Sequence, residues 1–300
     1  MSANAGDPFW FVQKTPATYN SPSGDYALLV SPKRRFGINK AHYTITHEGK
    51  QIWSCKKQFA LDRVVVTDRG YVIGSAHDGY CHLVIWDTAG RIMLDEWFEQ
   101  YMQLHSGPEP YVKQILVSEG HDFVTFRLHG QDSRDGKRIG SLVPAEVWSS
   151  YRISTGELMH EYKAIEQYAK LDSRLFVIDA QIIPGTPLIL VHWYDRGLHS
   201  KKEERSSQFS LVDIAGQPIW SLRMDKDYTD VDMPRKLRSG GPIPFFSKNP
   251  AILASNISHQ FKLRRFADDR VLTFSVKKQA DNKWSIREES QADFVPKNDK

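Results

Sequence analysis

The chain of 300 residues has only two cysteines, Cys55 and Cys81. Two are too few for a disulfide framework at this length, and they lack the C-x-x-C spacing of a zinc site. No apolar run approaches the roughly 18 residues of a transmembrane helix, and the opening MSANAGDPFWFVQ has neither the basic nor the apolar region of a signal peptide. We therefore expect a cytoplasmic protein with no bound metal and no cofactor.

A strong excess of one charge is also lacking, because 40 Lys and Arg residues oppose 36 Asp and Glu residues and leave a net charge of +4. A surplus this small does not by itself indicate nucleic-acid or membrane binding. No nucleophile elbow, Walker loop, H-E-x-x-H or dinucleotide fingerprint occurs. Hydrophobic residues make up 40% of the chain and aromatic residues 12%, which suffices for a large core and excludes wholesale disorder.

Four segments repeat one pattern, an alternating strand followed by a polar turn that ends in glycine and by a second strand. The turn glycines are Gly49, Gly90, Gly156 and Gly216. Three positions after each glycine stands an apolar residue: Ile52, Met93, Met159 and Ile219. The pattern predicts β-hairpins at 42–54, 82–97, 147–162 and 209–222, with a positive φ angle at each glycine.

Short apolar runs precede the hairpins, at 26–30, 71–75, 123–126 and 188–191, with 251–255 as a fifth. Runs of this kind are typical of strands that are buried on both faces. Further candidate strands stand between one hairpin and the next run, at 63–67, 114–118 and 176–182. We therefore predict four-stranded units, each with a buried inner strand, a hairpin and an outer strand after the hairpin.

The residues SPSGDYALLVS at 21–31 resemble the opening of a WD-repeat blade. IWDTAGRIML at 85–94 and VDIAGQPIW at 212–220 are similar to blades of both the WD-repeat and the quinoprotein type. The resemblance covers roughly residues 20–290 and implies a β-propeller, which hides strand edges by packing blade against blade. It concerns the fold, because propellers serve as scaffolds, lyases, hydrolases and oxidoreductases alike.

The predicted fold is all-β, with a single β-propeller of about five four-stranded blades over residues 9–290. Its fifth blade combines the run 251–255 with a hairpin at 260–276 and an outer strand at 283–289. We expect the N-terminal strand FWFVQ at 9–13 to close the ring, since three exposed aromatic side chains favour aggregation. Residues 1–8 and 291–300 are expected to be flexible ends. A pair of β-sandwiches with long loops is the alternative.

In a propeller the connections between inner strand and hairpin all lie at one end of the ring. Three of them, 31–41, 128–145 and 194–208, are long and rich in Lys and Arg, and loops of this length are commonly functional or disordered. We assign to this partner-binding rim Lys33, Arg34, Arg35, Lys40, Arg134, Lys137, Arg138, Arg196, Lys201, Lys202 and Arg205. The simpler interpretation is that these charges serve solubility.

Polar residues are dense in the segment 74–82, which contains Ser75, His77, Asp78, Cys81 and His82. If Cys81 and His82 begin a strand, they point to opposite faces and cannot readily share a metal ion. A polar loop is therefore the expected role of this segment, and no catalytic residue is assigned. His192, Trp193 and Tyr194 end a buried run; the two aromatic residues are candidates for the mouth of the central channel, and His192 is expected to be structural.

Two further stretches are candidates for contacts with a partner. The carboxylates of 225–232 do not match an EF-hand loop, and the segment 223–249 is predicted to be a long excursion that contacts a partner. FKLRRF at 261–266 has the composition of a nucleic-acid site, but strand alternation divides its basic and aromatic residues between two faces.

The function that best fits these expectations is a non-catalytic β-propeller, acting as a protein-interaction module or as a subunit of a larger assembly through its basic rim. Its partner would be another protein subunit with an acidic surface, and no membrane is involved. A propeller-type hydrolase or lyase with a site in the central channel, or a nucleic-acid-binding accessory subunit, are the alternatives.

Overall fold

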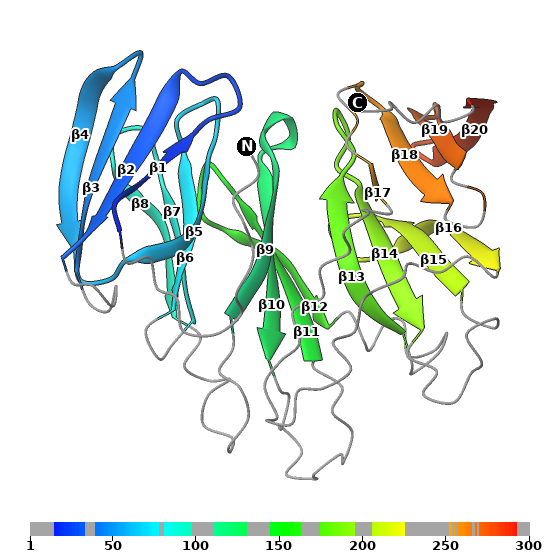
Figure 1. Cartoon of the computed structure of the whole chain (residues 1–300), viewed down its shortest axis with the longest axis horizontal. Coiled ribbons are helices and arrows are strands. Elements are labelled where there is room, and N and C mark those ends of the chain that lie inside the picture. The colour runs from blue at the N-terminus through cyan, green and yellow to red at the C-terminus, as the bar shows by residue number, and fades with distance from the viewer. Residues whose placement is uncertain are drawn as a thin grey trace, which may run out of the picture. The chain divides into compact units, whose positions relative to one another are not determined.

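The structure is a computed structural model of the chain (Figure 1). It describes residues 15–33, 40–77, 81–97, 111–130, 145–163, 175–195, 206–225, 252–253, 255, 257–265, 268 and 270–292. Within these ranges the regular structure is β-strand apart from one 3₁₀ turn, Glu119–His121, so the all-β prediction is confirmed. None of the described residues forms a helix that is long and apolar enough to cross a membrane.

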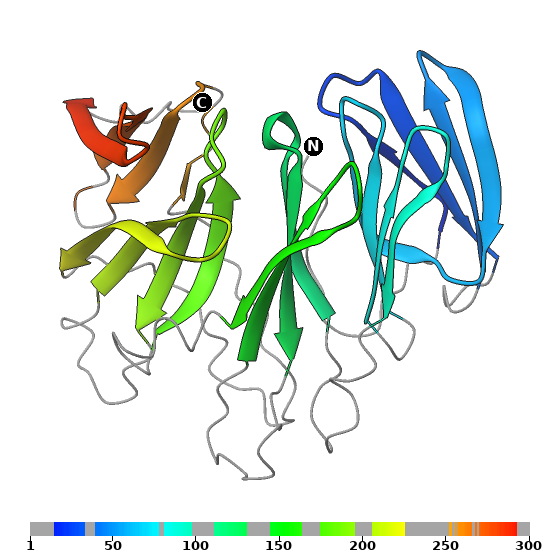
Figure 2. The same ribbon diagram turned by 180° about the vertical axis from the view of Figure 1, so that it is seen from behind.

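The chain divides into two compact units, and the first, Met1–Ala164, contains three four-stranded antiparallel sheets (Figures 1 and 2). Sheet 1 consists of β1 (Ala17–Asn20), β2 (Tyr26–Pro32), β3 (Ala41–His47) and β4 (Lys50–Lys57). Sheet 2 consists of β5 (Leu61–Val66), β6 (Val72–His77), β7 (Cys81–Trp86) and β8 (Ile92–Trp97). Sheet 3 consists of β9 (Tyr111–Ser118), β10 (Phe123–Gly130), β11 (Ala145–Arg152) and β12 (Leu158–Lys163).

The second unit, Ile165–Lys300, contains two more sheets of the same topology. Sheet 4 consists of β13 (Leu175–Ile182), β14 (Ile189–Asp195), β15 (Ser206–Val212) and β16 (Pro218–Asp225). Sheet 5 consists of β17 (Ile252–Leu253), β18 (Gln260–Arg265), β19 (Arg270–Lys278) and β20 (Trp284–Ala292). Five four-stranded antiparallel sheets, with the strands of each in chain order, fit the predicted propeller of about five blades. Residues 9–13 lie outside the described part, and ring closure stays a prediction.

One part of the strand assignment was wrong. The strands predicted at 63–67, 114–118 and 176–182 do not end the preceding sheets; they begin the following ones, because β5 pairs with β6, β9 with β10 and β13 with β14. The physical reason is a tight turn after each of these strands. Between β5 and β6, Gly70 has a φ angle of 80° and its N–H donates to the carbonyl oxygen of Thr67 at 3.0 Å. In sheets 1 to 4 the buried run is therefore the second strand.

The four predicted hairpins are confirmed, and their glycines have φ angles between 72° and 77°. The apolar residue three positions after each glycine proves to be the extra residue of a β-bulge. In sheet 2, for example, Ile85 pairs with Leu94 and Trp86 pairs with Ile92, which leaves Met93 unpaired. The bulges in sheets 1, 3 and 4 fall on Ile52, Met159 and Ile219. A bulge bends its strand and increases the local twist.

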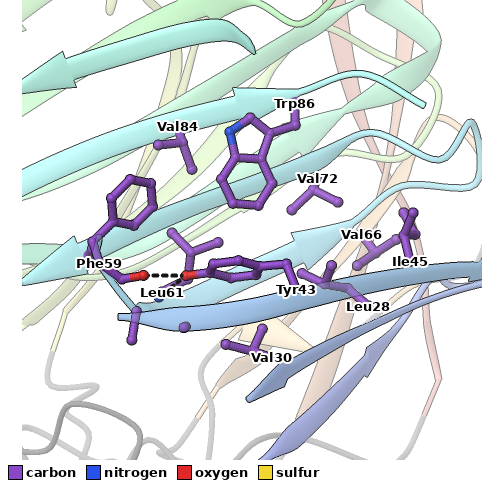
Figure 3. Close-up of a cluster of buried hydrophobic side chains, with 13 residues drawn as sticks. Leu28, Val30, Tyr43, Ile45, Phe59, Leu61, Val66, Val72, Val84 and Trp86 are labelled. Carbon is purple, nitrogen blue, oxygen red and sulfur yellow. Dashed lines mark hydrogen bonds between the residues drawn. The ribbon is translucent and has the colours of Figure 1, made fainter. Parts of the chain in front are cut away.

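Sheets 1 and 2 enclose a hydrophobic core around Tyr43 and Trp86 (Figure 3). The two rings meet edge to face with centroids 5.0 Å apart. The hydroxyl of Tyr43 donates to the carbonyl oxygen of Phe59 and accepts the N–H of Leu61, both at 2.9 Å. These bonds satisfy backbone groups in the link from sheet 1 to sheet 2, which would otherwise be buried without a partner. Burial raises the pKa of the Tyr43 hydroxyl well above its usual range.

A second core lies between sheets 2 and 3, and a third joins sheet 4 to sheet 5. Trp86 is buried in the core of sheets 1 and 2, and Trp53 is partly buried against it. Trp220 is partly buried against the core of sheets 4 and 5. Trp193, a candidate for the mouth of a channel, is only 2% exposed and lies in a packed interior. The side chain of Tyr194 is outside the described part.

Candidate functional site

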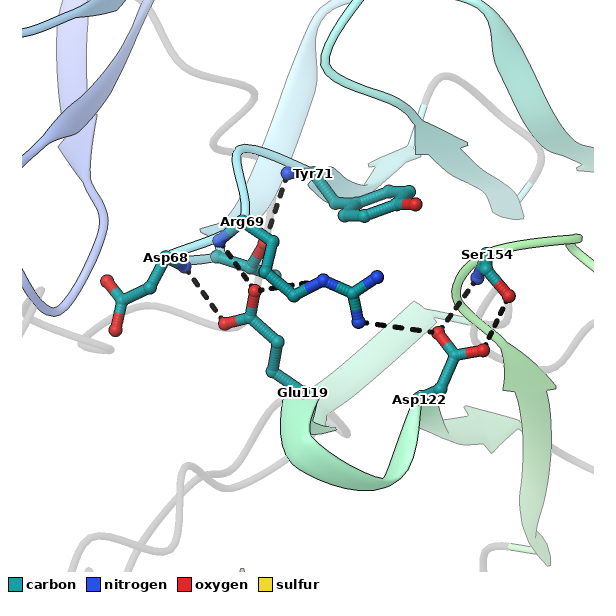
Figure 4. Close-up of polar contacts among 7 residues, drawn as sticks. Asp68, Arg69, Tyr71, Glu119, Asp122 and Ser154 are labelled. Atoms are coloured by element: carbon teal, nitrogen blue, oxygen red, sulfur yellow. Dashed lines mark hydrogen bonds and ion pairs between the residues drawn. The ribbon is translucent and has the colours of Figure 1, made fainter.

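The turns between the first and second strands of sheets 1, 2 and 3 are joined at one end of the first unit, and Figure 4 shows the contacts between sheets 2 and 3. In sheet 1, the N–H of Ser23 donates to Oδ1 of Asp68 at 2.7 Å. Asp68 lies in the corresponding turn of sheet 2, and its own N–H donates to Oε2 of Glu119 at 3.0 Å. The N–H of Arg69 donates to Oε1 of the same carboxylate at 2.6 Å. Glu119 begins the corresponding turn of sheet 3, so three successive turns are fastened side by side.

Further polar contacts extend this network, both within sheet 3 and between sheets 2 and 3. The N–H of Ser154, in the hairpin turn between β11 and β12, donates to Oδ1 of Asp122 at 3.1 Å. Arg69 lies 4.0 Å from the carboxylates of both Glu119 and Asp122. Exposed ion pairs at this distance contribute little stability. The hydrogen bonds from backbone N–H groups to the carboxylates of Asp68 and Glu119 therefore determine how the turns align.

This alignment determines where the opposite ends of the strands lie. β2, β6 and β10 all start at the joined turns and run for six to eight residues, a length of about 20 Å or more. Their far ends, at Pro32, His77 and Gly130, therefore emerge together at the opposite end of the first unit. The predicted rim loops 31–41 and 128–145 connect to the strands at that end, which we call the basic end. The third predicted loop, 194–208, belongs to the second unit.

Of the residues assigned to the rim, Lys33 and Lys40 are described. The N–H of Lys33 donates to the carbonyl oxygen of Lys40 at 2.8 Å and closes the base of the loop that carries them. The loop is thus anchored on the rigid pair of β2 and β3. Outside the described residues lie Arg34, Arg35, Arg134, Lys137, Arg138, Arg196, Lys201, Lys202 and Arg205, and their part in the rim stays a prediction.

Two basic residues at the same end were missed by the sequence analysis. Lys57 pairs with Ala41 and Lys56 with His42, so the last residues of β4 lie beside the first residues of β3. Lys56 is exposed, and Nζ of Lys57 lies 5.5 Å from the ring centroid of Trp86. Counting residues outward from the turn at Gly49 would have placed both lysines near Lys40.

The cysteines offer no activated thiol. Burial raises the pKa of the Cys55 thiol, and nearby Lys57 opposes this effect only in part. Burial also raises the pKa of the Cys81 thiol well above its usual range. A thiol is a nucleophile only as the thiolate, so both residues act as small packing groups, Cys81 buried and Cys55 half-buried.

The expectation of a polar loop at 74–82 was wrong for both ends of the segment, because Gly74, Ser75 and Ala76 are buried in β6 and Cys81 and His82 are buried at the start of β7. Cys81 and His82 do point to opposite faces, as predicted. Cys81 belongs to the core between sheets 2 and 3, whereas the ring of His82 stacks on Trp97 with centroids 3.8 Å apart. Ser75 donates a hydrogen bond to Asp62. His77 and Asp78 have no described side chains. Among the side chains that are described, no three His, Cys, Asp or Glu residues gather as a metal site would require.

Two further stretches were predicted to contact a partner or considered as a nucleic-acid site, the segment 223–249 and FKLRRF at 261–266. Residues 226–249 of the predicted excursion lie outside the described part. In FKLRRF the predicted alternation is confirmed, because Phe261 and Leu263 are buried in the core while Lys262 and Arg264 lie on the other face of β18. Phe266 is not described.

No protein-family model and no curated protein matches the chain. Among solved structures, the chain is similar to hydrazine synthase of Kuenenia stuttgartiensis, at 9% identity and a TM-score of 0.46. The match covers 87% of this chain and 64% of the hydrazine synthase chain, which is less than two thirds of its length. It is also similar to the β-propeller domain of Myceliophteria thermophila Cps50 (Swd1), at 12% identity and a TM-score of 0.41, covering 95% and 73%. Hsv2 of Kluyveromyces lactis is similar at 10% identity and a TM-score of 0.30, covering 90% and 83%.

At these identities and TM-scores no activity, ligand or partner carries over to this chain. The chain nevertheless resembles β-propellers at the level of fold. This resemblance rests on its own five four-stranded sheets in succession.

Proposed function

We propose that the chain is a non-catalytic interaction module of a larger protein assembly, and that its basic end binds an acidic surface of another protein subunit. The observation that supports the proposal is the alignment of the turns at Ser23, Asp68 and Glu119. With these turns joined, the loops that carry Lys33, Arg34, Arg35 and Arg134 leave the first unit from one end. Lys56 and Lys57 add two cations there.

Rigid sheets reduce the cost of binding, because loops whose ends are already fixed lose less conformational entropy when a partner docks. Positive charge in several adjacent loops steers an acidic partner toward the surface and raises the association rate. The same physics makes the interaction sensitive to ionic strength. We therefore expect the complex to dissociate as salt is raised, without unfolding of the chain.

Charge reversal tests this function. In the rim variant Lys33, Arg34 and Arg35 are each replaced by Glu; in the control variant Lys50, Lys278 and Lys283, which lie at hairpin turns, are replaced by Glu. Proteins that co-purify with the tagged chain from its native source are identified by mass spectrometry, and the purified partner is then titrated against each variant. The rim variant should lose the partner while the control variant, with the same net charge, retains it. Equal retention or equal loss in both variants would contradict the proposal.

A further inference from the structure

Sheet 5 uses only one of its two faces for the core of the second unit. Phe261 and Leu263 of β18 and Phe274 and Val276 of β19 are at most 3% exposed and belong to the core shared with sheet 4. Because side chains alternate along a strand, the intervening residues lie on the other face. We call this the polar face, and among the described residues it consists of Leu253, Gln260, Lys262, Arg264, Val271, Thr273, Ser275, Lys277, Ser285, Arg287 and Glu289.

The pairing register sets these side chains in rows across three strands. Gln260, Ser275 and Arg287 form one row, and Lys262, Thr273 and Glu289 form the next. Lys277 lies opposite Ser285 at the end of the face. Since paired strands are about 4.8 Å apart, cations and hydroxyl groups lie at close spacing on the surface of the sheet.

The polar face carries an excess of positive charge. Four cations, at 262, 264, 277 and 287, share it with one carboxylate, that of Glu289, which accepts a hydrogen bond from Nε2 of Gln260 at 3.1 Å. The nearby carboxylates of Asp268 and Asp281 are paired with cations in the hairpin turns. Lys277 and Arg287 are exposed, and Lys262 is half-buried.

We propose that the polar face binds the sugar–phosphate backbone of a single-stranded nucleic acid. Phosphate oxygens accept hydrogen bonds from Lys, Arg, Ser and Thr side chains, which are the groups this face presents in rows. A protein partner would need a buried apolar anchor at the centre of its interface. The apolar side chains among the described residues of the face are Leu253, on the edge strand β17, and Val271, near the start of β19; both are half-buried and lie away from its centre.

The shape of the face favours a single strand over a duplex. A flexible strand can follow the twisted surface of a sheet, whereas a rigid duplex cannot bend to do so. No aromatic side chain stands on the described part of the polar face to stack on bases, so binding is independent of base sequence. The site belongs to the second unit and to a different partner class, so it holds or fails independently of the proposed function. It requires that the polar face is not packed against sheet 1, as it would be in a closed ring of five blades.

The test uses the full chain and a short fluorescein-labelled oligothymidylate, titrated by fluorescence anisotropy at several salt concentrations. In the face variant Lys262, Lys277 and Arg287 are replaced by Gln. In the control variant Lys33, Lys50 and Lys56 are replaced by Gln, which removes the same charge from exposed positions of the first unit. The face variant should lose at least about tenfold in affinity, and its log–log salt slope should shrink by about 2, because each phosphate contact to a single strand contributes about 0.7. The control variant should keep affinity and slope.

A third variant controls for a folding artefact. It combines Lys262→Arg, Lys277→Arg and Arg287→Lys, so it keeps the charge of the face and should still bind the oligonucleotide. Equal weakening in the face and control variants would overturn the site, as would absence of wild-type binding at low salt. Tighter binding of a duplex of the same length would overturn the choice of a single strand. Displacement of the oligonucleotide by polyglutamate at equal charge concentration would assign the face to an acidic protein and overturn the proposal.

Discussion

Gly156 packs directly on the backbone of Met93, so that a Cβ atom at Gly156 would overlap the carbonyl oxygen of Met93. Met93 is the bulge residue of β8, and Gly156 lies in the hairpin turn of the next sheet. The same relationship occurs one sheet earlier, where a Cβ atom at Gly90 would lie 3.1 Å from the ring of Trp53, next to the bulge at Ile52. Each hairpin turn thus fits against the bulged last strand of the preceding sheet, and this contact sets how the sheets of the first unit stack.

Gly156→Ala should therefore destabilise the first unit far more than Gly49→Ala. Both glycines have positive φ angles, which cost an alanine about 1–2 kcal/mol. At Gly49 nothing lies within 4 Å of the added Cβ atom, so only this cost applies. At Gly156 the backbone of β8 must also move, which adds about 1–3 kcal/mol. Urea unfolding followed by tryptophan fluorescence measures the difference, and equal midpoints for the two variants would show that the turn does not hold the bulge.

The joined turns give a second prediction. Glu119→Ala removes the acceptor of the N–H groups of Asp68 and Arg69, so their amide hydrogens should exchange about tenfold faster, corresponding to about 1.4 kcal/mol. Hydrogen exchange measured by NMR reads both amides directly. Glu157→Ala, which removes a carboxylate that lies 3.7 Å from Arg152 on an exposed turn, should change exchange at these two amides by less than twofold. Unchanged exchange in Glu119→Ala would mean that the turns align by other contacts.

The strands were largely predictable because their signals are local. The turn glycines Gly49, Gly90, Gly156 and Gly216 require positive φ angles, and unbroken apolar runs such as 123–126 mark strands buried on both faces. Sheet membership was not predictable in the same way. The strand at 63–67 is separated by short turn sequences from the strands on both sides, and the deciding feature is the hydrogen bond from Gly70 to Thr67, which composition does not reveal.

For the basic end, the sequence predicted which charged residues take part but not how they lie relative to one another. Sequence alone places Lys33 and Lys40 at the base of one loop, but Lys56 and Lys57 join them through strand register. The common direction of the loops depends on contacts between residues far apart in sequence, such as Asp68 and Glu119, and no local pattern specifies these. The polar face of sheet 5 likewise emerges only when three strands are in register.

Tyr43→Phe tests the link between sheets 1 and 2. The substitution keeps the ring on Trp86 and removes the hydroxyl that satisfies Phe59 and Leu61, which should cost about 2–3 kcal/mol because both backbone groups are left buried. Urea unfolding reads the loss, and exchange at the Leu61 amide should accelerate in parallel. Tyr26→Phe is the matched control, since its ring stacks on His47 at the edge of the core and remains after the change. A loss below about 0.5 kcal/mol in Tyr43→Phe would show that water replaces the hydroxyl.

The burial of His192 lets us predict how the stability of the second unit depends on pH. Its ring is 2% exposed and stacks on Phe209 with centroids 4.6 Å apart, and burial lowers its pKa from 6.5 to about 3. Between these values the unfolded chain takes up a proton that the folded chain does not. The contribution of neutral His192 to the free energy of unfolding is therefore fully present above about pH 6.5 and is lost as the pH falls toward 3. At pH 5 the loss from this residue is about 2 kcal/mol.

His192→Phe keeps the aromatic stack on Phe209 and removes the proton uptake. The loss of unfolding free energy between pH 7.5 and pH 5 should therefore be smaller in this variant than in the wild type by about 2 kcal/mol. Urea unfolding at the two pH values gives this difference, which is independent of any constant effect of the larger ring on packing. His160→Gln, which removes an exposed imidazole on β12, is the matched control for the loss of one histidine. If His192→Phe and the wild type lose equal stability on acidification, the imidazole is protonated in the folded chain and its environment is not the packed interior described above.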